Sequence, residues 1–172
     1  MPNLTFPKSA LEPRPNLPAG LIQVIFSGFQ PKLSKNKENP TVNLNPQLKI
    51  INDARTDASG KPLNGQKVFD SLNLSFLPRL QDFVHAFGCE MQENGENVDL
   101  PGYFDGDTSQ PDPSKWGTYH GPLENEMATL ILKEVPSRKA GAKPTDTQVD
   151  IDKYVCRVGG CTTQHMESLI RS

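Results

Sequence analysis

The sequence predicts a mainly β domain with one central helix, and three observations support that fold class. Short runs alternate apolar and polar residues with the period of two that marks a half-buried strand. Only residues 75–88 combine an apolar stripe at helical spacing with signals at both ends. Pro and Gly are frequent, at 16 and 13 of the 172 residues, so much of the chain must form turns and loops.

Two strands are predicted in the first third of the chain. Residues 21–26 are rich in β-branched side chains, and Gly28 and Pro31 are expected to end that strand. In residues 42–51, Val42, Leu44, Leu48 and Ile50 alternate with the polar residues Asn43, Asn45, Gln47 and Lys49. Pro46 interrupts this second run, which predicts a bulge or an edge position there.

Three more strand segments and one long loop follow. A short strand is expected at residues 67–69, and two longer strands at 127–135 and 148–158. The basic, Gly- and Pro-containing residues 137–146 between the last two predict a hairpin turn. Residues 89–126 show no period and are expected to be an acidic, irregular loop.

The predicted helix spans residues 75–88 and has recognisable ends. Ser75 is a good N-cap, Pro78 fits the first turn, and Gly88 supplies the stop. Its apolar stripe is expected to pack on the core and consists of Leu77, Leu80, Phe83, Val84 and Phe87.

Strands, one helix and then strands is the order of an oligonucleotide-binding-like antiparallel barrel, here with long loops. Many β-rich α+β domains share this order. The chain divides into a Pro-rich arm at 1–19, one β-rich binding domain at 20–161 and a C-terminal segment at 162–172.

Composition and motifs favour a binding protein in the cytoplasm rather than an enzyme or a membrane protein. No run approaches the ~18 apolar residues of a membrane span, and the N-terminus lacks the pattern of a signal peptide. The odd count of three cysteines suits a reducing compartment. The chain contains no phosphate-binding loop, nucleophile elbow or HExxH motif, so no catalytic residues are assigned.

Charge is strongly segregated along the chain although the total is only −2. Residues 1–80 carry a net charge of +5 and residues 81–133 a net charge of −8. Strand-borne cations follow phosphates and aromatic rings stack on bases, so the basic half predicts a single-strand groove. The alternative is that lysines protect exposed strand edges while the aromatic rings belong to the core. The candidate nucleic-acid-binding residues are Phe29, Lys32, Lys35, Lys37, Lys49, Arg55, Lys61 and Lys67.

Cys156, Cys161 and His165 lie within ten residues around a Gly-Gly turn. Two thiolates and an imidazole are zinc ligands, and Cys89 or His120 would supply a fourth. The alternative is that these cysteines are small packing residues and that no cofactor is bound. An enzyme that uses this same group is a third possibility.

Three stretches resemble a group of bacteriophage single-stranded DNA-binding proteins. They are GLIQVIFSGFQPKLSKNKENPTVNLNPQLKIIN, GKPLNGQKVFDSLNLSFLPRLQDFVHAFGCE and EMATLILKEV with VDIDKYVCRVGGC, about two-thirds of residues 20–161. The resemblance implies a non-catalytic, sequence-tolerant protein that binds single-stranded DNA in phage replication or recombination, alone or as an oligomer, with other phage replication or recombination proteins as further partners. The chain departs from the group in its Pro-rich arm, its acidic loop and its cysteine-containing C-terminus. The rival class is a phage structural, assembly or adaptor protein that binds no nucleic acid.

Overall fold

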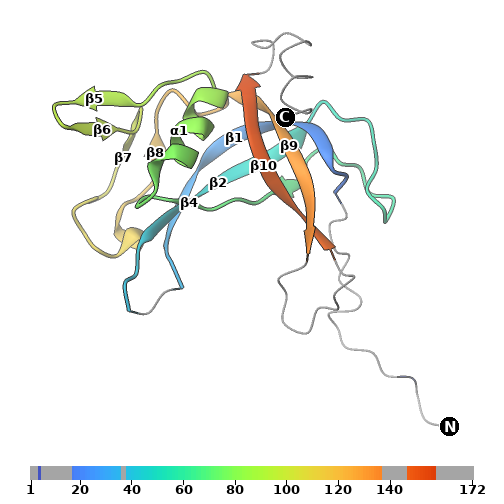
Figure 1. The fold of residues 1–172 in the computed structure, drawn as a ribbon, viewed down its shortest axis with the longest axis horizontal. Coiled ribbons are helices and arrows are strands. Elements are labelled where there is room, and N and C mark those ends of the chain that lie inside the picture. Colours follow the sequence, from blue (N-terminus) through green and yellow to red (C-terminus); the bar gives the residue numbers. More distant parts are fainter. Residues whose placement is uncertain (1–3, 5–16, 36–37, 137–146, 158–172) are drawn as a thin grey trace.

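The computed structural model describes residue 4 and residues 17–35, 38–136 and 147–157. Within these residues the chain forms strands β1 to β10, the helix α1 and one short 3-10 helix, η2 (Figure 1). Every strand pairing is antiparallel. The prediction of a mainly β fold with a single α-helix is therefore confirmed for the described part of the chain.

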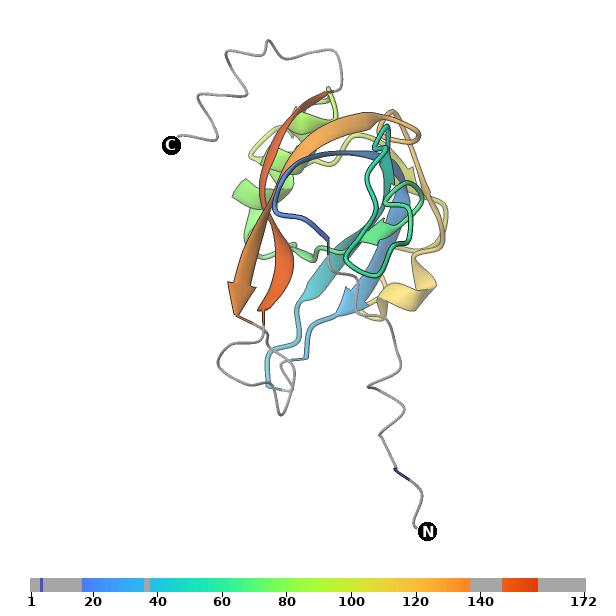
Figure 2. The ribbon, with the colours of Figure 1, turned by 90° about the vertical axis from the view of Figure 1, so that its right-hand side faces the viewer.

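The main sheet has the strand order β10-β9-β1-β2-β3, and β4 pairs with β2 beside β3. No ladder joins β3 or β4 to β10, so the sheet is open among the described residues. Figure 2 shows that the sheet is curled rather than flat, with α1 beside it. The bounds of these strands are β1 Gly20–Leu33, β2 Val42–Ile51, β3 Lys67–Val68, β4 Leu72–Asn73, β9 Met127–Pro136 and β10 Thr147–Arg157.

Strand β1 is longer than the sequence predicts, because a β-bulge replaces the expected end. The β1–β2 register shifts between Phe26 and Gly28, after which pairing continues to Leu33. Only residues 20–25 also pair with β9. Pro31 therefore lies where β1 has a single partner strand, a position that tolerates the missing N–H.

The structure gives a reason for the proline inside β2. On one side Pro46 pairs with Phe29 of β1. On the other side, β2 pairs with β3 at residues 48–49 and with β4 at residues 43–44, so Pro46 falls between the two ladders. Strand β2 is an inner strand of the sheet, but Pro46 has no ladder partner on that side and therefore needs no N–H there, as at a sheet edge.

Helix α1 spans Leu77–Ala86 and ends as its sequence predicts. Gly88 has φ +82°, its N–H donates to the carbonyl of His85, and the N–H of Cys89 donates to that of Val84. This pair of hydrogen bonds is a Schellman motif. The predicted N-cap is wrong, because Phe76 occupies the cap position without a side-chain bond, while the Ser75 hydroxyl donates to Asn73 Oδ1.

The core is organised around five aromatic rings that join α1 to the sheet. Phe83 of α1 lies 5.5 Å from both Phe26 and Phe29 of β1, centroid to centroid, and 4.6 Å from Phe87. Tyr119 completes the cluster at 5.1 Å from Phe29. Aromatic pairs at these separations stabilise a core beyond the area that they bury.

The acidic segment 89–126 is mostly turns and loops, as predicted from the sequence, but it also contains short regular elements that the sequence did not predict. It forms two hairpins and η2, and the first hairpin projects from the body of the domain (Figure 1). Tyr119 and Leu123 anchor the segment in the core. The pattern was missed because each strand has only two or three residues, too few to show a period. The elements are β5 Gln92–Asn94, β6 Asn97–Asp99, β7 Tyr103–Phe104, η2 Pro113–Lys115 and β8 Tyr119–His120.

The backbone of Gly102, directly before β7, lies close against β8. We therefore expect the substitution Gly102→Ala to destabilise the domain. An added Cβ would lie 2.5 Å from the carbonyl oxygen of His120 and 2.5 Å from the Tyr119 hydroxyl, and φ is +97°. Overpacking of this kind costs about 1–3 kcal/mol. Gly95→Ala is the matched control, because Gly95 also has positive φ but faces open space. Urea unfolding of both variants tests this, and equal losses would contradict the steric explanation.

Candidate functional site

A groove of about 870 Å³ opens between the β2–β3 end of the sheet and strand β10. It lies at the open side of the sheet, where no β-ladder joins β3 to β10. Four cationic side chains line it: Lys32, Lys49, Lys67 and Arg79. The residues that line it are Ser27, Gln30, Lys32, Asn45, Pro46, Gln47, Leu48, Lys49, Lys67, Val68, Phe69, Asp70, Ser71, Arg79, Asp150 and Ile151.

Three of the predicted lysines come together in this groove. Lys32 comes from β1, Lys49 from β2 and Lys67 from β3, and all three are exposed. Lys49 and Lys67 are direct partners in the β2–β3 register. Like charges placed opposite each other destabilise a strand pair. No described carboxylate forms an ion pair with these lysines, so an external anion would relieve the repulsion.

Phe69 gives the groove an exposed aromatic ring. It is not among the nucleic-acid-binding residues predicted from the sequence. Its side chain is 74% exposed, whereas that of neighbouring Val68 is 4% exposed. Phe69 directly follows β3, and successive residues of an extended chain point to opposite faces, so Val68 and Phe69 were expected to face opposite sides. That alternation was the available signal, but it does not say which of the two faces outward.

Three carboxamide side chains also line the groove. Gln30 and Asn45 are cross-strand partners, and Gln47 follows two residues along β2. The Oδ1 atoms of Asn45 and of neighbouring Asn43 are buried and accept no hydrogen bond within the described structure. Amide groups add hydrogen-bonding capacity without charge, so the groove offers neutral polar groups as well as cations.

Phe29 does not belong to this surface, which corrects its assignment as a base-stacking residue. Its side chain is only 6% exposed and packs against Phe26, Phe83 and Tyr119. The bulge before Gly28 shifts the alternation by one residue, and this turns Phe29 inward. A ring enclosed in this way has no free face for a base.

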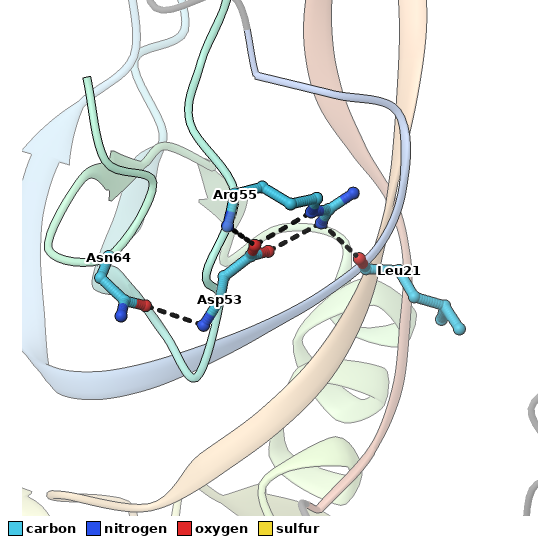
Figure 3. Close-up of polar contacts among 4 residues, drawn as sticks. All are labelled: Leu21, Asp53, Arg55 and Asn64. Carbon is cyan, nitrogen blue, oxygen red and sulfur yellow. Dashed lines mark hydrogen bonds and ion pairs between the residues drawn. The ribbon is translucent and has the colours of Figure 1, made fainter. Parts of the chain in front are cut away.

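Arg55 is committed to a structural contact rather than to the groove (Figure 3). Its Nε and Nη2 donate to the two carboxylate oxygens of Asp53 at 2.9 and 2.7 Å, and Nη2 also reaches the carbonyl of Leu21 at 3.5 Å. The Asn64 side chain accepts the Asp53 N–H. The hydrogen bond from Arg55 lowers the pKa of Asp53, and the reciprocal bond raises the pKa of Arg55. The pair stays ionised and fastens the turn after β2 to the start of β1.

The remaining predicted cations lie apart from the groove or outside the described residues. Lys35 is exposed at the β1–β2 connection, and Lys61 is exposed on the turn-rich segment between β2 and β3. Neither lines the groove. Lys37 falls outside the described residues.

The predicted zinc ligands are not placed as a set. Cys156 is half-buried near the end of β10, whereas Cys161 and His165 lie outside the described residues. Cys156 is disulfide-bonded, a state in which its sulfur is not a thiolate ligand. Cys89 is a free, half-buried thiol whose pKa is raised mainly by burial. Across the described ranges, no three His, Cys, Asp or Glu side chains lie close enough together to hold a metal.

Comparisons with known proteins return no family model, no curated protein and no solved structure that matches this chain. Of the helices described, none is both long and apolar enough to cross a membrane. The groove and its side chains therefore carry the functional argument.

Proposed function

We propose that this chain is a non-catalytic, sequence-tolerant single-stranded DNA-binding protein of phage replication or recombination, and that the groove holds the DNA. The observation that carries the proposal is the opposed pair Lys49 and Lys67 beside the exposed ring of Phe69. Cations that follow a backbone and rings that stack on bases are the two parts of a single-strand groove.

The strand arrangement supports an oligonucleotide-binding-like reading of the fold. Strand β1 pairs with the next long strand, β2, and also with β9, and α1 lies between β4 and β9 in the chain. If β3 and β4 count as one interrupted strand, the order is that of an oligonucleotide-binding barrel opened between its third and fifth strands. In such barrels the face of the second and third strands binds the oligonucleotide. The groove lies on that face.

The charge of the groove favours a polyanion over a neutral ligand. Oligonucleotide-binding barrels also bind oligosaccharides, which need no cations. Here Lys32, Lys49 and Lys67 form no ion pair among the described residues. Two carboxylates also line the groove: Asp70 is paired with Arg79 at 2.9 Å, and Asp150 accepts a hydrogen bond from Gln148 Nε2 at 2.9 Å. Phosphates spaced along a flexible strand would supply the missing negative charge, while the carboxamides of Gln30, Asn45 and Gln47 can hydrogen-bond to any base edge.

A salt-dependent binding titration tests the proposal. A fluorescent single-stranded oligonucleotide is expected to bind far more tightly than the same sequence as a duplex. The logarithm of the affinity should fall with the logarithm of salt concentration by about 0.7 per phosphate contact, because counterions are released. Equal affinity for both forms, or no binding at low salt, would contradict the proposal and favour the assembly or adaptor class.

A further inference from the structure

The open edge of the sheet is bridged by side chains instead of by a β-ladder. Asp70, in the link between β3 and β4, accepts hydrogen bonds on Oδ2 from Arg79 of α1 at 2.9 Å and from the hydroxyl of Tyr154 of β10. Arg79 Nη2 also donates to the carbonyl of Ile151 of β10 at 3.0 Å. One carboxylate and one guanidinium thus join the two strand edges that border the groove.

This bridge is anchored in the core. The ring of Tyr154 lies 5.1 Å from that of Phe83 in an edge-to-face contact, and the guanidinium of Arg79 lies 5.5 Å from the centre of the Tyr154 ring. The carboxylate of Asp70 is only 13% exposed. Burial, and then the charge of Asp70, raise the pKa of Tyr154 well above its ordinary value, so the phenol keeps its proton and donates it.

The bridge lies next to Phe69 in the chain, because Asp70 follows it directly. Strand β3 ends at Val68, so Phe69 is not held by the β2 ladder. Asp70 Oδ1 accepts the N–H of Ser71 at 2.8 Å, and Oδ2 holds the link to α1 and β10. Both carboxylate oxygens are therefore engaged, and the residue next to Phe69 in the chain is tied to α1 and β10.

We propose that Asp70, Arg79 and Tyr154 form a clasp that closes the open side of the sheet and positions the Phe69 ring for stacking. The clasp residues are positioning residues, and the stacking part of this inference rests on the proposed function. A ring that is held in place before binding loses less conformational entropy when a base stacks on it. Without the clasp, Phe69 would still be present but would contribute little to affinity.

The variant Tyr154→Phe tests the clasp with the least disturbance, because it removes one hydroxyl and keeps the ring in the core. Tyr103→Phe is the matched control, since Tyr103 is 63% exposed on β7 and lies outside the groove. In the free protein, hydrogen exchange of residues 67–72 and 149–154 should accelerate in Tyr154→Phe and not in the control. Unchanged exchange at both segments would overturn the clasp itself.

A double-mutant cycle with Phe69→Ala then tests positioning. In the Phe69 background, Tyr154→Phe is expected to weaken single-strand binding by about 3- to 10-fold, the range for ordering a side chain. In the Phe69→Ala background the same change should have almost no effect. Equal losses in both backgrounds would refute positioning. If the unmodified protein binds no oligonucleotide, the proposed function fails, while the exchange measurement still decides whether the clasp exists.

Discussion

The triple variant Lys32→Glu, Lys49→Glu, Lys67→Glu is expected to lose nearly all single-strand binding, by roughly 100-fold or more, because counterion release is lost and carboxylates repel the backbone. These lysines come from three different strands and meet only in the groove. The fold should survive, since all three side chains are exposed. Lys49 and Lys67 already form a like-charged cross-strand pair, and changing both to Glu replaces it with another like-charged pair. Fluorescence anisotropy at low salt measures the loss, and circular dichroism verifies folding.

The control for this variant reverses the same number of charges elsewhere. Lys61, Lys115 and Lys133 are exposed and do not line the groove. Changing these three to Glu alters the net charge equally, so it reproduces any effect of overall charge. A small loss is expected from long-range repulsion, which salt screens. If both triple variants lose the same affinity, the groove is not the binding surface.

The substitution Phe83→Ala is expected to cost about 3–5 kcal/mol of unfolding free energy, the range for removing a large aromatic side chain from a core. Phe83 is fully buried and contacts Phe26, Phe29, Phe87 and Tyr154. It therefore joins α1 to both β1 and β10. Domains of this size have about 5–15 kcal/mol in total, so the variant should be only marginally folded. Urea unfolding measures the difference.

Phe76→Ala is the control for this loss, because Phe76 precedes α1 and its side chain is 63% exposed. Surface substitutions of this kind usually change stability by less than about 0.5 kcal/mol. A comparable loss in both variants would mean that the aromatic core does not hold the helix to the sheet.

Local periodicity was sufficient to predict β2, β9, β10 and α1, whereas the prediction for β1 stopped at residue 26 although that strand continues to Leu33. The alternation across residues 42–51 matches β2 residue for residue, and the stripe and terminal glycine predict α1 within two residues at each end. Such patterns predict elements well because one face of each element must be buried. In a strand or helix of ten residues, apolar side chains therefore recur at several positions along that face. The strands of two or three residues in segment 89–126 are too short to show such a recurrence.

Side-chain assignments that depend on register or on distant partners required the tertiary structure. A single β-bulge turns the Phe29 side chain into the core. The Arg55 guanidinium forms an ion pair with Asp53 and donates to the carbonyl of Leu21. The sequence alone determined that the first half of the chain is basic and β-rich. Pairing between strands far apart in the chain decided which lysines share the groove. The same pairing decided that Phe69 lines the groove with them. Those contacts depend on where the chain folds back, and no local pattern of residues specifies that.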